Sequence, residues 1–515
     1  MYRIFDNISY EILNEGEKFE IAGIEYDSRK IRENFVFIAM TGNNVDGHDF
    51  IQKAIDSGAK MIVAEKKVNV SEYSGYEKVS FILIENVRKS LGIIASNYYN
   101  YPQNKLKIVG ITGTNGKTTS SYILENILEK TARIGTTGNR ILDEEFETVN
   151  TTPESLELIK LINESVKRGV EYFIMEVSSH ALEIGRVNML EFDSAIFTNL
   201  TQDHLDFHGT MENYFNAKRK IFSMLRKNGT GIINIDDEYG KVIYNNIVSK
   251  KRSRAGGNDD KLPKVRAYSF GEDETADYRL CQVDYHAKAD FVGISCKIKV
   301  KTASDFNVNF GIPGKFNALN GTVAVALAHS LGIDSEILEN SLLKLRVNGR
   351  MEVVYKSDKY IVLVDYAHNA LSMESLLSTL RAYNPKRLVV VFGCGGNRSK
   401  DRRYSMGEIA GKNADFSIVT ADNSRFERVE DIIADIRGSI EKTGGSFIEI
   451  PDRREAIYYA VENACEGDII AIIGKGHEDY QEINGVRQHF LDSEVVKEAL
   501  RARKAIKMKG LDSGN

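Results

Sequence analysis

The chain has 515 residues, a formal net charge of −5 and four cysteines. At roughly 100–200 residues per domain, this length predicts about three domains. Hydrophobic residues make up 42% and charged residues 27% of the sequence, which is typical of a globular protein and excludes a collagen-like or disordered chain. The mildly acidic balance argues against broad electrostatic binding to nucleic acid or to an anionic membrane, while it leaves room for local anion sites.

Targeting and redox features favour a cytoplasmic location. Residues 1–13 do not show the basic and then apolar succession of a signal peptide. No apolar run approaches the roughly 18 residues that a membrane span needs. The four cysteines form no C-x-x-C pair, and four in so long a chain do not make a disulfide framework. We therefore expect a protein of the reducing cytoplasm.

Residues 1–103 are predicted to form a small α/β domain. Short apolar runs at 35–40, 61–64 and 81–84 alternate with turn-rich segments, as strands separated by connections do. The segment Tyr99-Asn100-Tyr101-Pro102 is typical of a domain boundary.

Residues 104–343 are predicted to form a second domain around a mostly parallel sheet, because apolar strand candidates alternate with helix-length segments. The strand candidates are 106–111, 172–177, 194–197 and 231–235. Residues 277–312 alternate polar and apolar, which predicts antiparallel strands added to the sheet. The polar and turn-rich segment 250–264 is predicted to be a solvated loop.

A Gly-rich loop follows the first strand of this domain and precedes a helical pattern over 117–130. Its sequence is Gly113-Thr114-Asn115-Gly116-Lys117-Thr118-Thr119. Backbone N–H groups in such a loop, together with the positive end of a helix, bind phosphate. Lys117 would supply a charge to the β- and γ-phosphates, and the Thr118 hydroxyl would ligate Mg²⁺. The strict phosphate-loop pattern has Gly where Ile111 stands, so this is a variant that indicates a nucleoside triphosphate without naming the reaction.

Acidic and histidine side chains follow the next two strands. Glu176 ends an apolar strand beside the loop, where a carboxylate can hold Mg²⁺ directly or through water. After the following strand, Asp203-His204-Leu205-Asp206-Phe207-His208 places two His and two Asp in six residues. The spacing does not decide whether His204 or His208 would bind metal.

Residues 344–515 are predicted to form a third, doubly wound domain of the dinucleotide-fold type. The strand candidates are 360–364, 387–392, 416–420, 447–450 and 468–473, with helix-length segments such as 429–441 and 453–464 between them. The whole chain is thus predicted to be an α/β protein of three domains. Cys394 lies in a tight Gly-Cys-Gly turn with no base paired to it in the sequence, so we interpret it as a buried thiol.

A set of segments in order along nearly the whole chain resembles the ATP-dependent Mur ligase family, which also includes folylpolyglutamate synthetases. Besides the Gly-rich loop, the matching segments are Glu176-Val177-Ser178-Ser179-His180, Asp203-His204-Leu205-Asp206, Tyr214-Phe215-Asn216-Ala217-Lys218, Gly314-Lys315-Phe316-Asn317-Ala318-Leu319-Asn320, Gly349-Arg350-Met351-Glu352, Asp365-Tyr366-Ala367-His368 and Gly474-Lys475-Gly476-His477-Glu478. The resemblance implies an enzyme that joins the amine of a diamino acid to the D-glutamate of UDP-N-acetylmuramoyl-L-alanyl-D-glutamate, using ATP and an acyl phosphate.

The resemblance also implies roles for single residues. Lys117, Glu176, His204 and Lys218 would be catalytic, with Thr118, Glu176, His204 and a carbamylated Lys218 serving two Mg²⁺. ATP would be held by the Gly-rich loop and by Asn317, Arg350, Asp365 and His368. The nucleotide-sugar dipeptide would be held by Ser28, Asn43, Asn44, Val45, Asn150, Thr151, Thr152, Ser178 and Arg186. The partners would thus be small-molecule substrates, without nucleic acid or membrane, and the chain would act as a monomer.

The added amino acid is predicted to be diaminopimelate. Its far end bears a carboxylate as well as an amine, whereas lysine bears only the amine, so its pocket needs an Arg and an acid. By resemblance, the pocket residues are Arg398, Asp422, Asn423, Ser424, Arg425, Gly474 and Glu478. Ser424 stands where the family's diaminopimelate enzymes have Pro, and Asn369-Ala370 stands where a Pro commonly follows His368.

Other functions remain open from the sequence. A lysine-adding ligase of the same family would share all but the Arg425 pairing. A folylpolyglutamate synthetase would leave the first domain without a use. A P-loop NTPase that acts as a switch or assembly factor would hydrolyse ATP without forming an amide.

Overall fold

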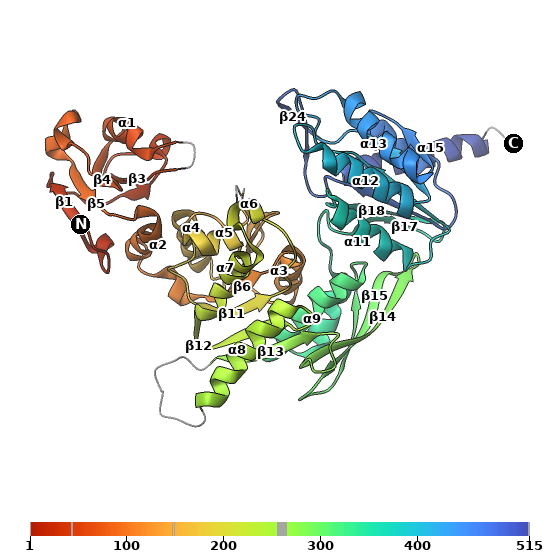
Figure 1. Cartoon of the computed structure of the whole chain (residues 1–515), viewed down its shortest axis with the longest axis horizontal. Coiled ribbons are helices and arrows are strands. Elements are labelled where there is room, and N and C mark those ends of the chain that lie inside the picture. Colours follow the sequence, from red (N-terminus) through yellow and green to blue (C-terminus); the bar gives the residue numbers. More distant parts are fainter. Residues whose placement is uncertain (1, 43–44, 147, 149, 255–264, 513–515) are drawn as a thin grey trace. The chain divides into compact units, whose positions relative to one another are not determined.

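The computed structural model describes residues 2–42, 45–146, 148, 150–254 and 265–512. The chain forms two compact units, Met1–Phe270 and Gly271–Asn515 (Figure 1).

The first part of the first unit is a five-stranded sheet with the order β1-β5-β4-β3-β2. Strands β2 to β5 are parallel to their neighbours, and β1 pairs antiparallel with β5. The strands are β1 (Glu11–Asn14), β2 (Gly23–Glu25), β3 (Phe35–Ala39), β4 (Ala59–Ala64) and β5 (Ser80–Leu83), and the α-helices are α1 (Ile51–Asp56) and α2 (Val87–Tyr98). The three strands predicted here are confirmed as β3, β4 and β5.

The rest of the first unit is built on a sheet with the order β13-β12-β11-β6-β10-β7-β8-β9, whose first six strands run parallel. Its strands are β6 (Lys107–Thr112), β7 (Thr131–Gly135), β8 (Gly138–Ile141), β9 (Glu144–Phe146), β10 (Tyr172–Glu176), β11 (Phe192–Phe197), β12 (Leu225–Asn234) and β13 (Arg266–Gly271). Its helices are α3 (Lys117–Ile127), α4 (Ser155–Lys167), α5 (Ser179–Ile184), α6 (Leu205–His208), α7 (Met211–Ser223) and α8 (Glu238–Arg254). The predicted parallel sheet is confirmed.

The loop predicted over 250–264 is wrong at its start, because α8 continues to Arg254. Lys and Arg are good helix formers, so the run Lys250-Lys251-Arg252 extends the helix instead of ending it. Residues 255–264 lie outside the described part of the chain.

The second unit begins with the antiparallel strands β14 (Tyr278–Ala287), β15 (Val292–Val300) and β16 (Phe306–Phe310), as the alternating pattern predicted. They are followed by α9 (Lys315–Ser330) and α10 (Ser335–Lys344). The alternation is clearest in β16, where Phe306, Val308 and Phe310 are buried while the residues between them are exposed.

A six-stranded sheet with the order β17-β18-β22-β19-β20-β21 forms the rest of the second unit. All its strands are parallel except the edge strand β17, which confirms the doubly wound prediction. Its strands are β17 (Glu352–Lys356), β18 (Tyr360–Asp365), β19 (Arg387–Phe392), β20 (Phe416–Val419), β21 (Phe447–Glu449) and β22 (Asp468–Ile473). Its helices are α11 (Ala370–Arg381), α12 (Lys400–Asn413), α13 (Val429–Thr443), α14 (Arg453–Glu462) and α15 (Asp492–Asp512). Strands β23 (Tyr480–Ile483) and β24 (Val486–His489) form a separate hairpin.

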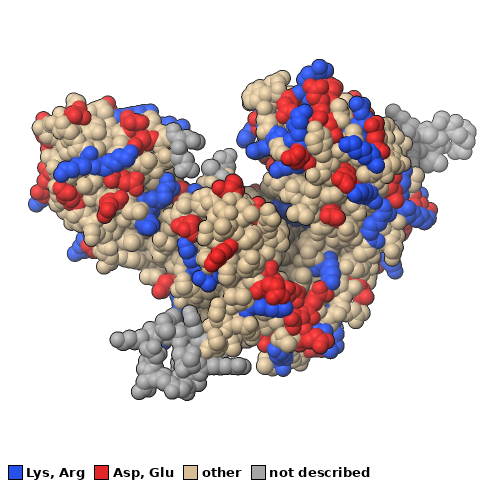
Figure 2. Space-filling model, viewed as in Figure 1, with Lys and Arg blue, Asp and Glu red and all other residues tan. Residues whose placement is uncertain are grey.

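The surface and the helices add two observations. On the face drawn in Figure 2, lysine and arginine side chains are interspersed with aspartate and glutamate over both units. Within the part of the chain that the structure describes, no helix has the length and apolar character that a membrane crossing requires.

Asn369, the first residue of the Asn369-Ala370 pair noted above, caps helix α11. Its side chain accepts a hydrogen bond of 2.9 Å from the Ser372 backbone N–H, and the Ser372 hydroxyl accepts one from the Asn369 N–H, which makes a capping box. We expect Asn369→Ala to lower the free energy of unfolding by about 1 kcal/mol and Asn369→Gly by only a few tenths. Urea denaturation of the full chain would measure both, and equal losses would contradict the capping role.

Candidate active site

The predicted phosphate loop connects β6 to the N-terminus of α3. Gly113 has φ of 150°, and a Cβ atom there would lie 1.9 Å from Thr198 Oγ1, so this position requires glycine. Lys117 Nζ donates to the backbone oxygens of Gly113 and Thr114, both at 2.9 Å. Ile111, where the strict pattern has Gly, is still a buried strand residue paired with Glu176. The curled loop therefore begins after Thr112, and its amides lie at a helix N-terminus that favours phosphate.

Glu176 is fully buried at the end of β10, beside this loop. Its carboxylate accepts hydrogen bonds from the Thr118 hydroxyl at 3.0 Å and from the Thr136 N–H and hydroxyl, both at 3.1 Å. Hydroxyl and carboxylate oxygens are the ligands that Mg²⁺ prefers, so this pair fits that ion. Among the described residues there is no group of three or more His, Cys, Asp or Glu that could hold a metal.

Lys218 lies on the buried face of α7 and reaches the same loop. It is 1% exposed, and its Nζ donates to the Gly113 backbone oxygen at 2.8 Å. Burial, and then the charge of Lys117, lower the pKa of Lys218 well below its ordinary value. A neutral amine is the form that adds to CO₂, so the environment of Lys218 is compatible with the predicted carbamate.

The two candidate histidines differ in their surroundings. His208 is buried and its Nε2 lies 2.9 Å from the Ser179 hydroxyl. The His204 side chain is 48% exposed, on a backbone with φ of 51°. The His180 ring lies 5.0 Å from the His204 ring, and burial followed by the charge of His204 lowers the pKa of His180. His204, the histidine that the resemblance implies as a metal ligand, is therefore the more accessible of the two side chains.

Several residues predicted to hold the dipeptide surround the end of β10. The Thr152 hydroxyl donates to the Glu176 backbone oxygen at 2.9 Å and accepts from the Ser178 N–H at 3.0 Å. Arg186 donates to the Thr152 oxygen at 3.0 Å. Helix α4 begins after these residues, and its N-cap Glu154 makes no side-chain hydrogen bond to the helix.

The other residues predicted to bind the dipeptide have fewer contacts with this group. The Thr151 hydroxyl lies 3.0 Å from that of Thr136, whereas Asn150 is exposed. Ser28 is buried at the start of a 3₁₀ turn, and Val45 is 58% exposed. Asn43 and Asn44 lie outside the described residues.

In the second unit, Arg350, Asp365 and His368 surround Tyr366 at the end of β18. The Asp365 carboxylate accepts from the Met351 N–H at 2.8 Å and from the Ala367 N–H at 2.7 Å, and burial raises its pKa. The Arg350 guanidinium lies 4.7 Å from the Tyr366 ring centre, and His368 Nδ1 lies 2.9 Å from the Tyr366 backbone oxygen. Asn317 lies in the first turn of α9, where its side chain donates to the Pro313 oxygen at 2.6 Å.

Two loops that follow β19 and β20 interlock and present two arginines. The Gly396 N–H donates to the Asn423 oxygen at 2.9 Å, and Arg425 Nη1 donates to the Gly396 oxygen at 2.7 Å. A Cβ on Gly395 would lie 3.0 Å from Arg425 Nη1 and 3.9 Å from Arg398 Cγ, so the two arginines flank this glycine. Guanidinium groups suit a carboxylate ligand.

The acidic residue of the predicted pocket lies against the second of these loops. Glu478 Oε2 accepts from the Asn423 side-chain amide at 3.0 Å, and Glu478 Oε1 accepts from the Tyr366 hydroxyl at 3.4 Å. Gly474, with φ of 114°, makes room for Asp422, whose Oδ2 would lie 2.7 Å from a Cβ there. Ser424, which lies between Asn423 and Arg425 in the chain, is buried. The structure thus brings Glu478 and Arg425 to one edge of the sheet.

The β23–β24 hairpin, which the sequence analysis missed, fixes the backbone of Arg425. The Arg425 N–H donates to the Glu482 oxygen at 3.0 Å, and the Asn484 N–H donates to the Arg425 oxygen at 2.6 Å. Asn484 and Gly485 both have positive φ, of 51° and 76°. The Asn-Gly pair at 484–485 is the sequence signal that would have predicted this hairpin.

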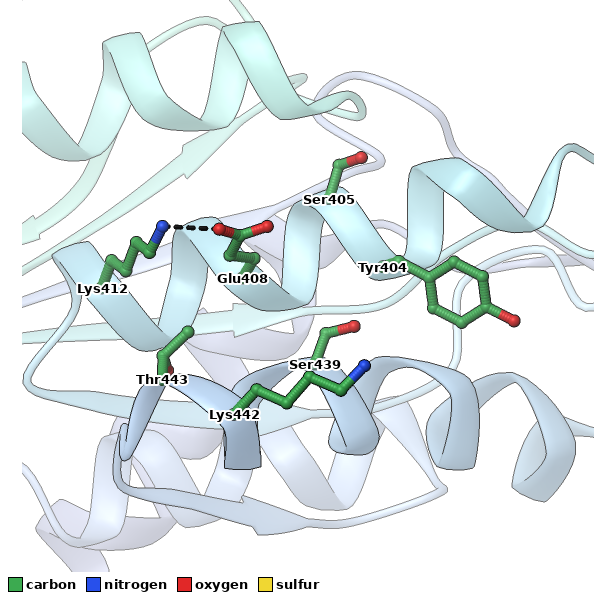
Figure 3. Close-up of a pocket in the computed structure, with 7 residues that line it drawn as sticks. All are labelled: Tyr404, Ser405, Glu408, Lys412, Ser439, Lys442 and Thr443. Carbon is green, nitrogen blue, oxygen red and sulfur yellow. Dashed lines mark hydrogen bonds and ion pairs between the residues drawn. The ribbon is translucent and has the colours of Figure 1, made fainter.

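Two other features of the second unit lie outside this pocket. Burial raises the pKa of Cys394 to about 12, which keeps it a thiol and agrees with its interpretation as a structural residue. A polar groove of about 540 Å³ lies between α12 and α13 (Figure 3). Its lining contains no candidate residue, and its Lys412 is paired with Glu408.

Comparisons with known proteins cover nearly the whole chain. Family models match residues 20–99 as "Mur ligase family, catalytic domain", 111–328 as "Mur ligase middle domain" and 349–476 as "Mur ligase, glutamate ligase domain". A relative from Fusobacterium nucleatum is 42% identical over 98% of this chain and 99% of its own length, and one from Clostridium perfringens is 39% identical over 97% and 99%. Both are named UDP-N-acetylmuramoyl-L-alanyl-D-glutamate–2,6-diaminopimelate ligase.

A solved structure agrees with these relatives. A structure of a UDP-N-acetylmuramoyl-L-alanyl-D-glutamate–2,6-diaminopimelate ligase is 33% identical, with a TM-score of 0.68, and the alignment covers 96% of this chain and 97% of that one. The predicted resemblance is therefore confirmed, and the chain belongs to the Mur ligase family of ATP-dependent ligases.

Proposed function

We propose that this ligase joins the amine of meso-diaminopimelate to the D-glutamate carboxylate of UDP-N-acetylmuramoyl-L-alanyl-D-glutamate, in peptidoglycan precursor synthesis. The relatives named for this reaction support it, since they match along their full length. The observation that supports the choice of amino acid is the fixed arrangement of Arg425 and Glu478 at one sheet edge, since diaminopimelate offers a carboxylate and an amine at its far end.

The reaction has two steps. A carboxylate oxygen of the dipeptide attacks the γ-phosphorus of ATP, ADP leaves, and an acyl phosphate forms. The amine then attacks the acyl carbon, loses a proton and expels phosphate. Both steps bring anionic oxygens together, so placed positive charge is the main requirement.

The residues of the first unit would supply this environment. The amides of the Gly-rich loop and Lys117 would bind the triphosphate, and the Lys117 ammonium is already held over the loop by Gly113 and Thr114. Arg186 and Thr152 would orient the dipeptide beside Glu176. Thr118 and Glu176 would hold one Mg²⁺, and His204 with carbamylated Lys218 a second. Bound magnesium would neutralise phosphate charge and raise the electrophilicity of the γ-phosphorus.

The second unit would complete ATP binding and deliver the amino acid. Asp365, fixed by two backbone N–H groups, and Arg350 would contact the nucleotide. Arg398 and Arg425 would pair the far carboxylate, and Glu478 the far amine. The domain assignment remains our proposal: residues 1–103 bind the nucleotide sugar, 104–343 bind ATP, and 344–515 bind the amino acid. We also propose a cytoplasmic monomer that acts on small molecules.

Phosphate release tests the proposed reaction. The full chain is assayed with ATP, Mg²⁺ and UDP-N-acetylmuramoyl-L-alanyl-D-glutamate, with meso-diaminopimelate, L-lysine or no amino acid, and the product is weighed by mass spectrometry. We expect release and an amide product with meso-diaminopimelate well above the other two reactions. Lys117→Met is the control for contaminating activity, because it removes the charge on the phosphate loop.

The alternatives predict different results. Equal phosphate release in all three reactions without an amide product would support an NTPase switch and refute the ligase reaction. A preference for L-lysine would refute only the choice of amino acid.

A further inference from the structure

A buried lysine, Lys475, lies directly after β22 and beside the predicted amino-acid pocket. Its side chain is 0% exposed. A buried ammonium is costly unless it is paired and hydrogen-bonded. Lys475 Nζ donates to the Tyr480 backbone oxygen, lies 3.4 Å from Asn423 Oδ1 and lies 3.5 Å from Glu478 Oε2. These contacts lie in or next to the segments that form the predicted amino-acid pocket.

Asn423 connects Lys475 to Glu478. Asn423 Oδ1 accepts from Lys475 and, at 2.9 Å, from the Glu482 N–H. Because two donors face this oxygen, the amide NH₂ group must point the other way, where it donates to Glu478 Oε2 at 3.0 Å. Lys475, Asn423 and Glu478 thus form a closed triangle in which the lysine supplies the charge and, together with the Glu482 N–H, the amide orientation that the carboxylate meets.

Glu478 and Lys475 differ in their access to solvent. The Glu478 side chain is 22% exposed, whereas Lys475 has no exposed surface. A substrate amine can therefore reach Glu478 but not Lys475. Any effect of Lys475 on substrate binding must act through Glu478.

A general structural role for Lys475 is less favoured, because another residue already ties the same strand ends together. Arg453 is buried, pairs with Asp492 at 2.6 Å, and donates to the Ala421 oxygen at 3.2 Å and the Ile473 oxygen at 3.0 Å. These bonds join the ends of β20 and β22 without Lys475. The fold is therefore expected to survive the loss of the lysine charge.

We propose that Lys475 is a positioning residue that holds Glu478 in the orientation that binds the far amine of the diamino acid. This inference rests on the proposed function. The buried ammonium fixes one oxygen of Glu478 through Asn423, while Tyr366 fixes the other. A carboxylate held in this way loses less conformational freedom when the substrate amine binds.

The test is steady-state kinetics of Lys475→Met, which keeps the length of the side chain and removes its charge. We expect KM for meso-diaminopimelate to rise about 10–100-fold, as loss of a charged hydrogen bond does. The kcat and the KM values for ATP and for the nucleotide-sugar dipeptide should stay within about twofold, since Lys475 reaches none of them directly. Lys412→Met is the matched control, because Lys412 is an exposed lysine of the same unit.

A double-mutant cycle with Glu478→Gln separates positioning from a structural effect. If Lys475 acts through Glu478, adding Lys475→Met to the Glu478→Gln enzyme should raise KM by less than about twofold more. Effects that multiply, or a parallel loss in kcat and in all three KM values, would overturn the proposal. An unchanged KM in Lys475→Met would overturn it as well.

Two further outcomes are kept distinct. If Lys475→Met does not fold, the same kinetics are measured on Lys475→Gln. This variant removes the charge but retains a donor toward Asn423, so the expected rise in KM for meso-diaminopimelate is smaller. A wild-type chain that adds no diamino acid refutes the proposed function itself. A wild-type chain that adds it, with a normal Lys475→Met variant, refutes only the positioning role.

Discussion

Replacing Lys218 by alanine is expected to lower the rate of amide formation by about 10³-fold, as loss of a preorganised charge at a reacting centre does. Lys218 is buried, donates to the Gly113 oxygen of the phosphate loop, and lies near the charge of Lys117. As an ammonium it would repel bound magnesium, whereas its carbamate would bind the metal. Alanine can do neither, so kcat from the phosphate-release assay should fall while the nucleotide-sugar dipeptide still binds.

A control variant and a direct measurement of the carbamate test the two parts of this prediction. Lys220→Ala changes an exposed lysine two residues along the same helix and should leave kcat within about twofold. Labelled bicarbonate should give a carbamate signal by ¹³C NMR in the wild-type enzyme and lose it in Lys218→Ala. A normal rate of amide formation in Lys218→Ala would contradict the catalytic role of Lys218. A slow Lys218→Ala enzyme, together with no carbamate signal in the wild-type enzyme, would contradict only the carbamylation.

The burial of Lys218 could have been found in the sequence. The buried residues of α7 include Tyr214, Ala217, Lys218 and Ile221, which follow the helical spacing of a core-facing stripe. A lysine inside such a stripe breaks the rule that charges lie outside, and such a break is expected at functional sites. The phosphate loop was easier to predict, because Gly-Lys-Thr between a strand and a helix is a local signal.

The pocket in the second unit was less predictable, for a physical reason. The strand ends follow from local pattern, Arg425 was assigned only by the family resemblance, and the Asn484-Gly485 turn was a local signal that was overlooked. The triangle of Asn423, Lys475 and Glu478 instead depends on tertiary packing of two loops that are about fifty residues apart. No periodicity in either segment indicates that contact. The spacing of His204 and His208 likewise does not indicate that His208 is the buried one of the two.

Replacing Arg425 by alanine is expected to change the choice of amino acid. KM for meso-diaminopimelate should rise about 10²–10³-fold, because the half-buried charge partner of the substrate carboxylate is removed. L-Lysine lacks that carboxylate, so its weak use should be unaffected, and the discrimination between the two should fall by the same factor. KM for ATP should stay within about twofold, since Arg425 contacts the Gly396 loop and the hairpin rather than Arg350 or Asp365.

The variant should fold, because the backbone of Arg425 is held by the Glu482 oxygen and the Asn484 N–H, and these bonds do not need the side chain. Arg437→Ala, which removes a half-exposed arginine of the same unit, is the matched control and should change neither KM. Arg425→Lys should recover only part of the loss, since an ammonium cannot make the two parallel bonds of a guanidinium. If Arg425→Ala raised KM for ATP as much as KM for meso-diaminopimelate, the residue would serve the nucleotide instead, and the specificity would have to come from Arg398 alone.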